Sequence, residues 1–135
     1  MANSIDVQKI VDGSRDTVIK VSLIGDNSGI FNAFTIFDPS SYVNTGINKK
    51  IVQVKYVLNG FSGVLLWGSS TANKPIINLE KDHYSDFFYE GGISNTGVSG
   101  NNGKILFTSD QTIPTGNMGY IMLFIKSKDL VNGER

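Results

Sequence analysis

Apolar and polar residues alternate along several short stretches of this chain, and this period of two limits the possible folds more than any other feature of the sequence. Residues 50–58 show it most clearly, because one face would carry Val52, Val54, Tyr56 and Leu58 and the other Gln53 and Lys55. Side chains of a β-strand point alternately to its two faces, so the pattern is typical of a strand with one buried face. Residues 17–24 alternate in the same way. Residues 120–126 form the last predicted strand, with Ile121, Leu123 and Ile125 on one face and Tyr120, Met122 and Phe124 on the other.

Breaks in the pattern fall at Gly, Asn, Asp, Ser and Pro roughly every ten residues, which is the spacing of turns in an all-β domain. We therefore expect nine strands and no helix, with the strands at residues 5–11, 17–24, 30–37, 50–58, 64–67, 76–79, 84–90, 104–108 and 120–126. Residues 30–37 are apolar on both faces, so this strand is expected to be covered on both sides. The glycine-rich residues 91–103 are expected to form a flexible surface loop.

Composition favours the same fold class. Ile, Val, Thr, Phe, Tyr and Trp number 48 of 135 residues, whereas Ala, Leu, Glu, Lys, Gln, Arg and Met number only 32. Because β-branched and aromatic side chains suit a pleated, half-buried surface, strands are favoured over helices. We predict an all-β chain that folds as an antiparallel β-sandwich or jelly roll of about eight or nine strands. Residues 1–135 are expected to form a single domain, with residues 129–135 as a flexible tail.

Charge and missing residue types exclude several function classes. Twelve basic and twelve acidic residues give zero formal net charge, which does not suit a sequence-independent nucleic-acid binder. The chain has no cysteine and one histidine, so thiolate and multi-histidine metal sites are excluded. No stretch approaches the ~20 apolar residues of a membrane span. The first residues contain Asp6 and no apolar run, so they are not expected to form a signal peptide. We expect no metal, no cofactor, no nucleic acid and no membrane partner.

Candidate catalytic groups are few. His83 has Asp82 and Asp86 close by in sequence, but no nucleophile elbow accompanies them, and a locally hydrogen-bonded histidine is the better interpretation. Asp82, Asp86 and Glu90 could pair as in glycosidases, yet acidic residues on a strand more often form a solvated edge. We therefore predict that the chain is not an enzyme and has no catalytic residue.

Two loops resemble ligand sites only superficially. Residues 26–28, Asp-Asn-Ser, lack the ligand spacing and the glutamate of a calcium loop, so an Asx turn is favoured. Residues 91–103 contain no phosphate-binding motif and precede no helix.

Aromatic side chains suggest a role in adhesion. Trp67 is expected in the core. Phe87, Phe88 and Tyr89 are consecutive in a predicted strand, so they would present aromatic bulk to both of its faces, and one face should then meet another chain. The predicted interface residues are Phe87, Phe88, Tyr89 and Phe61.

Four segments of the chain resemble a known family. They are residues 10–29 (IVDGSRDTVIKVSLIGDNSG), 64–68 (VLLWG) and 86–95 (DFFYEGGISN), together with the GKILFTS and GYIMLFIKSK segments within 103–128. Together they resemble a small structural protein found in the virions of tailed bacteriophages. By analogy with jelly-roll cement proteins, the resemblance implies a decoration protein that binds and stabilises the capsid shell. It further implies that the major capsid protein or another virion protein is the partner, with self-association as a homo-dimer or homo-trimer. The chain would be assembled in the host bacterial cytoplasm and would lie on the capsid surface.

Three other functions remain open at this point. The chain could be a β-domain of the tail, neck or fibre of a virion. It could be a carbohydrate-binding module, which would need Trp67 or a tyrosine exposed beside Asp and Asn in a concave site. An enzyme would need His83 in a pocket with a hydroxyl nucleophile.

Overall fold

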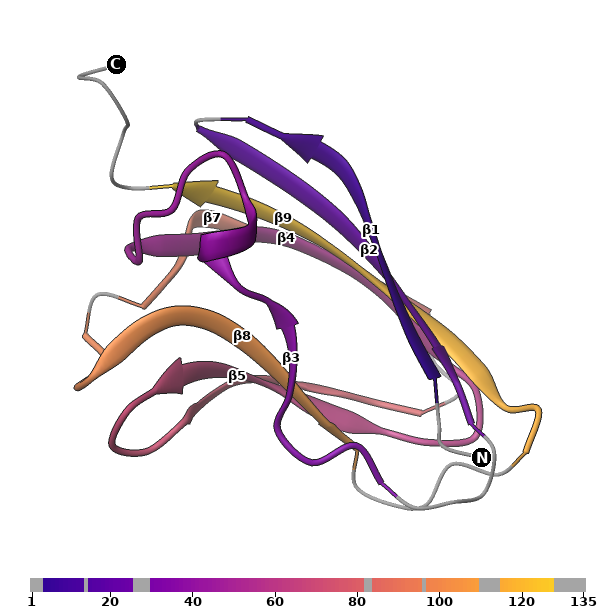
Figure 1. The fold of residues 1–135 in the computed structure, drawn as a ribbon. Helices are drawn as coiled ribbons and strands as arrows, with labels where there is room; N and C mark the ends of the chain where they lie inside the picture. The colour runs from indigo at the N-terminus through magenta and orange to yellow at the C-terminus, as the bar shows by residue number, and fades with distance from the viewer. Residues whose placement is uncertain are drawn as a thin grey trace.

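The described residues of the chain form nine β-strands and one short 3-10 turn, η1 (Pro39–Ser41) (Figure 1). The computed structural model describes residues 4–13, 15–25, 30–81, 84–95, 97–109 and 115–127, and of residues 4 and 84–91 it describes the backbone alone. The strands are β1 (Ser4–Asp12), β2 (Asp16–Ile24), β3 (Phe34–Phe37), β4 (Lys49–Leu58), β5 (Gly63–Ser69), β6 (Lys74–Leu79), β7 (Tyr84–Ser94), β8 (Asn101–Ser109) and β9 (Met118–Ser127).

The strands form two antiparallel sheets packed face to face. Sheet A has the order β1-β2-β9-β4-β7 and sheet B the order β3-β8-β5-β6. Strand pairs are nested, because β2 pairs with β9, β3 with β8, β4 with β7 and β5 with β6. The chain thus runs like one long hairpin rolled into a sandwich, which is jelly-roll topology, with β1 added at the edge of sheet A. The predicted fold class is confirmed.

The core lies between the sheets and consists of the alternate residues that the period of two predicts. Ile19, Val21 and Leu23 of β2 are fully buried, as are Ile121 and Leu123 of β9. Because these strands are neighbours, their buried residues pack side by side in one layer. The ring of Trp67 is also in the core, with an exposed fraction of 2%, as predicted.

Two details of the predicted strands are wrong. Ile51 is buried and Val52 is only half-buried, because a β-bulge between Ile51 and Gln53 shifts the alternation of β4 by one residue. The third strand, β3, covers only residues 34–37 of the predicted 30–37, and its Phe34 side chain is 46% exposed. This strand is therefore not covered on both sides.

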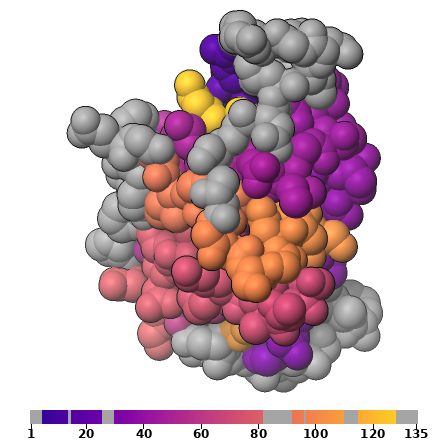
Figure 2. All heavy atoms as spheres, turned by 90° about the vertical axis from the view of Figure 1, so that its left-hand side faces the viewer, coloured from indigo at the N-terminus to yellow at the C-terminus, as the bar shows by residue number. Residues whose placement is uncertain are grey.

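Three polar loops are joined by hydrogen bonds at one end of the sandwich. They are residues 38–48, residues 70–73 and the described residues 95 and 97–100, and we call them the loop end. Thr71 Oγ1 donates to the Ser99 carbonyl at 3.1 Å, and Asn95 Nδ2 donates to the Ile47 carbonyl at 2.9 Å. Figure 2 views this end, where the three segments form one continuous surface. The predicted loop 91–103 is shorter than expected, since β7 extends to Ser94 and β8 begins at Asn101.

Edge strand β1 is held to the loop end by Lys9 and Tyr42. The Lys9 ammonium lies 4.4 Å from the centroid of the Tyr42 ring and also donates to the Ser41 carbonyl. Asp12 Oδ1 accepts from the Val43 amide at 2.8 Å. Burial raises the pKa of the Tyr42 hydroxyl, and the nearby Asp12 carboxylate raises it further.

This contact predicts a loss of stability in alkali. The folded protein retains the Tyr42 proton above about pH 10, where an unfolded tyrosine loses it. The free energy of unfolding should therefore fall as the pH rises above that point. Tyr42→Phe removes the titrating group, so urea unfolding from about pH 9 to about pH 11 should show a shallower decline for the variant. Parallel curves for the two proteins would contradict the assignment.

Candidate interaction surface

The outer face of sheet A carries apolar side chains where a solvated sheet would carry polar ones. Strand β9 lies in the middle of this sheet and directs Ile121, Leu123 and Ile125 into the core. Alternation then places the intervening residues on the outer face. These residues are Met118, Tyr120, Met122 and Phe124. An antiparallel sheet with one wet face normally alternates apolar and polar residues cleanly, so this strand departs from the rule.

Register sets the neighbours of each of these side chains. Met122 is paired with Lys20 of β2 and Lys55 of β4, so a lysine lies on each side of it. Phe124 is paired with Val18 and Gln53, and Tyr120 with Ser22 and Val57. We call this surface the β9 face and define it by ten residues: Val18, Lys20, Ser22, Gln53, Lys55, Val57, Met118, Tyr120, Met122 and Phe124.

The β9 face is partly open to solvent, since Met118 is exposed and the other nine residues are half-buried. Met118 is 52% exposed, and its register partner Ile24 is 45% exposed. A hollow of about 350 Å³ lies around Met118 and Tyr120, and another of about 360 Å³ lies beside Phe124. Partly exposed aromatic and methionine side chains are common at protein-binding surfaces.

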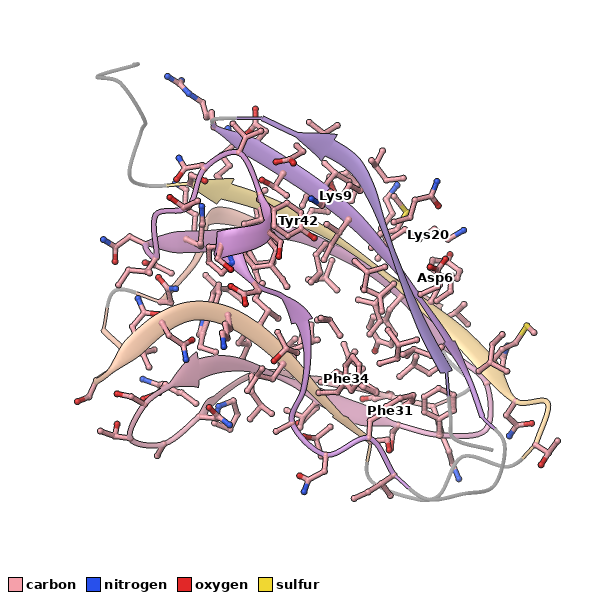
Figure 3. All side chains as sticks on the ribbon, viewed as in Figure 1. Asp6, Lys9, Lys20, Phe31, Phe34 and Tyr42 are labelled. Carbon is pink, nitrogen blue, oxygen red and sulfur yellow. The ribbon has the colours of Figure 1, made fainter. Side chains whose placement is uncertain are left out.

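Lysines of this face lie over aromatic rings. The Lys20 ammonium is 5.6 Å from the Tyr120 ring centroid, and the Lys55 ammonium is 5.8 Å from that of Phe124. Farther along, Lys126 forms an ion pair with Asp16 at 3.8 Å. Figure 3 shows Lys20 and Asp6 on the side of β1 and β2 that points away from sheet B, and Lys9 and Tyr42 on the inner side. The β9 face therefore combines an apolar centre with charged residues of both signs around it, since Asp86 of β7 is the register partner of Lys55.

Of the four predicted interface residues, Phe61 was predicted wrongly. Its exposed fraction is 0% and it belongs to the core cluster, so it offers no surface to a partner. Phe87, Phe88 and Tyr89 lie in strand β7 as predicted, but their side chains lie outside what the structure describes. The backbone of Phe88 is paired with Gln53 and that of Phe87 with Val54.

The sequence interpretation missed Tyr120, Met122 and Phe124 as surface residues. A signal was present, because residues 120–125 are apolar at every position, and only one face of a strand can enter a single core. Lys20 and Lys55 could not have been placed beside Met122, since their proximity depends on pairing between strands far apart in the chain.

The side chains of the candidate catalytic and calcium-loop residues lie outside what the structure describes. Asp82, His83 and residues 26–28 lie outside the described residues, and Asp86 and Glu90 are described by their backbone alone. Within the described part of the chain, no cluster of His, Asp and Glu could hold a metal ion. Nor does that part contain a helix long and apolar enough to cross a membrane.

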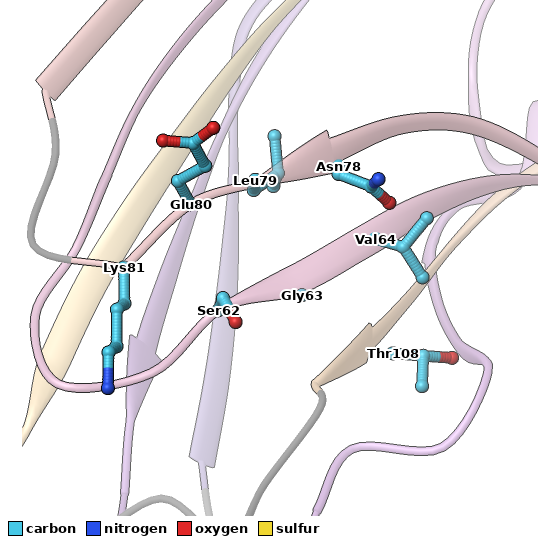
Figure 4. A pocket seen from close by; sticks show the side chains of 8 residues that line it. All are labelled: Ser62, Gly63, Val64, Asn78, Leu79, Glu80, Lys81 and Thr108. Atoms are coloured by element: carbon cyan, nitrogen blue, oxygen red, sulfur yellow. The ribbon is translucent and has the colours of Figure 1, made fainter.

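A larger hollow, of about 550 Å³, lies on sheet B beside the ends of β5 and β6 (Figure 4). Eight residues line it: Ser62, Gly63, Val64, Asn78, Leu79, Glu80, Lys81 and Thr108. The described residues of this lining include no aromatic ring on which a sugar could stack and no imidazole, and residues 82–83, which follow Lys81, lie outside the described residues. Among the described residues, the β9 face is the stronger candidate interaction surface.

Comparisons with known proteins assign no family. No family model matches the chain, and no curated protein matches it in sequence. Among solved structures, the chain is similar to the family 11 carbohydrate-binding module of the cellulosomal cellulase Lic26A-Cel5E of Clostridium thermocellum. That match has 10% sequence identity and a TM-score of 0.33, and it covers 99% of this chain and 87% of that chain. So loose an overlap transfers no residue and no function from the module to this chain.

Proposed function

We propose that this chain is a non-enzymatic structural protein of a bacteriophage virion, a decoration protein that binds the capsid shell and stabilises it. The observation that carries the adhesive part of this proposal is the β9 face, an apolar surface with aromatic side chains on a sheet of five strands. The choice of a virion as the setting depends on the sequence resemblance described above.

A rigid jelly roll suits such a role. A decoration protein needs no reacting group, only a stable scaffold and a surface complementary to its partner. Tyrosine is among the residues enriched at interface hot spots, and methionine is common on adaptable binding surfaces; the β9 face carries Tyr120, Met118 and Met122. Contacts repeated over a symmetric shell add up, so modest affinity at each site is enough.

Mass spectrometry of purified particles tests the proposal. The particles should come from the phage whose genome encodes the chain. A copy number on the order of hundreds is expected for a decoration protein, because a shell repeats its surface many times. A number on the order of a dozen would instead support the alternative of a tail, neck or fibre domain. Absence of the chain from the particles would overturn both.

A variant of the β9 face tests the surface itself. Met122→Ser with Phe124→Ser should weaken binding to shells at least about thirtyfold, because interface hot spots are worth roughly 2 kcal/mol or more. Both side chains are half-buried, so the free energy of unfolding should fall by about 1.5–3 kcal/mol in the double variant. Val64→Ser is the matched control, since Val64 is a half-buried residue on the outer face of sheet B. Equal binding by the double variant and the wild type would move the interface elsewhere.

The carbohydrate-binding alternative has lost its main aromatic candidate. Trp67 is in the core and cannot stack on a sugar ring. Tyr120 is half-buried on the β9 face, between Ser22 and Val57, with no acidic register partner. Glycan-array binding that disappears in Tyr120→Ala would favour this alternative, and we expect none.

A further inference from the structure

Strand β1 is the outer strand of sheet A and has a neighbour on only one side among the described residues (Figure 1). It pairs with β2 over residues 4–12, and no other described strand or loop forms a backbone hydrogen bond with it. The second edge of β1 therefore carries backbone N–H and C=O groups that no described residue pairs. Such a row of donors and acceptors is a template for one more strand.

The side chains of β1 are exposed as well. Residues 6–11 are exposed at every position, and Val7, Ile10 and Val11 are 36–48% exposed. Ile5 is the apolar residue of this strand that packs against the core. Contiguous exposed apolar residues mark interaction sites more often than ordinary surface. A strand laid beside β1 would cover both these side chains and the open backbone edge.

The other three edge strands of the described sheets are less suited to pairing. Strand β3 has four residues, and β6 contains Pro75, which has no N–H to donate. Strand β7 is irregular, because four of its residues lie between Phe88 and Ile93 where β4 has one. By contrast, residues 4–9 of β1 contain no proline and pair with β2 in an unbroken register. Lys9 does not guard this edge, since its ammonium lies over the Tyr42 ring.

We infer that β1 pairs with β1 of a second copy of this chain, antiparallel and about a two-fold axis, so that two copies of sheet A form one continuous sheet. Ile5, Val7 and Lys9 share the inner face, because their register partners on β2 are buried in the core. Asp6 and Gln8 lie on the outer face. Paired residues must share a face, so the axis passes through a residue and not between two.

An axis through Val7 gives the best register. It places Val7 opposite Val7 of the second copy, Asp6 opposite Gln8, and Ile5 opposite Lys9, so no charge meets a like charge. An axis through Asp6 would oppose two carboxylates, which destabilises a strand pair. An axis through Gln8 would bring the β-bulge after Lys9 into the pairing. Residues 5–9 are thus self-complementary, which a strand from a different protein does not require.

A single cysteine reports this pairing directly, because the chain has no cysteine of its own. Val7→Cys would place two thiols opposite each other with their Cα atoms about 4.5–5.5 Å apart, which is within the range of a disulfide. Mild oxidation with oxidised glutathione should give a covalent dimer. The matched control is Val43→Cys, since Val43 is an exposed valine of the loop end. We expect Val7→Cys to crosslink at least about tenfold faster than this control, because the dimer raises the local thiol concentration.

Sedimentation measurements on chains without cysteine test the same register. The wild-type chain should show a reversible dimer whose population rises with concentration. Gln8→Lys places an ammonium opposite Asp6 of the second copy and should tighten the dimer about fivefold, because two cross-strand pairs change in each dimer. Gln8→Glu opposes two pairs of carboxylates and should weaken it by about the same factor. Circular dichroism and thermal unfolding of each variant check that it is folded.

The outcomes separate this inference from the proposed function. A wild-type chain that stays monomeric, with Val7→Cys crosslinking no faster than Val43→Cys, overturns the β1 pair. A dimer that Val7→Cys does not trap and that the Gln8 variants do not alter also overturns it, because the interface then lies elsewhere. In both cases, binding of the chain to shells leaves the decoration role standing. A β1 dimer that binds no shell overturns that role and leaves the pair intact.

Discussion

Trp67→Ala should lower the free energy of unfolding by about 3–5 kcal/mol. Trp67 is the largest fully buried side chain of the described core, and it lies on β5, which has a sheet neighbour on each side. Its backbone is paired with Ile105 of β8 and Lys74 of β6, so the surrounding strands are held in place and cannot collapse into the space left by the ring. Urea unfolding at constant pH measures the loss. A decrease below about 1 kcal/mol would show that the ring does not support the core.

Trp67→Phe separates the volume of the ring from its polar nitrogen. Trp67 Nε1 is buried and has no hydrogen-bond partner in the described structure. An unpaired buried donor destabilises a fold by about 1–3 kcal/mol, so its removal offsets part of the cavity left by the smaller ring. We expect this variant to lose less than about half as much stability as Trp67→Ala. Equal losses would mean that the indole nitrogen is bonded, for example to a buried water molecule.

Asn95→Ala should cost about 2–3 kcal/mol, which is the second largest effect we expect. The Asn95 side chain is 0% exposed. Its Oδ1 accepts from the Lys49 amide at 3.0 Å, and its Nδ2 donates to the Ile47 carbonyl at 2.9 Å and to Asn101 Oδ1 at 3.0 Å. The variant would leave the Lys49 amide buried without this acceptor and would detach two loops of the loop end from each other.

Two controls define this prediction. Asn95→Asp keeps the shape but places a carboxylate against two acceptors, so it should destabilise at least as much as alanine at neutral pH. Asn78→Ala removes an exposed asparagine from β6 and should change stability by no more than about 0.5 kcal/mol. Hydrogen exchange at Lys49 should quicken in Asn95→Ala, and unchanged protection there would contradict the role assigned to the side chain.

The alternation of apolar and polar residues predicted the strands well, because burial of one face of each strand produces that alternation. Ile19, Val21 and Leu23 had to face the same side, and a single core required that side to be buried. The pattern failed at Val52, where one extra residue in β4 reverses the alternation without any Gly or Pro to mark it. It also failed at Phe34, because an apolar residue near a sheet edge is not necessarily covered.

The candidate site was harder to predict than the fold. Phe61 was predicted as an interface residue because it is aromatic and other aromatic residues follow it in the sequence. Its side chain is fully buried in the core. Met122 could not be placed among its neighbours, because Lys20 and Lys55 lie on strands whose residues are 102 and 67 positions earlier in the chain. A single sequence contains no measure of such pairings.

The nested pairing of the strands also has a consequence for synthesis in the cell. Strand β9 is the last strand of the structure, yet it occupies the middle of sheet A, between β2 and β4. Until its residues have left the ribosome, β2 and β4 lack a common neighbour, and their apolar faces stay open to the solvent and to other nascent chains. Completion of this sheet therefore needs pairing between strands far apart in the chain, which favours slow folding and leaves apolar faces open to aggregation until β9 is in place.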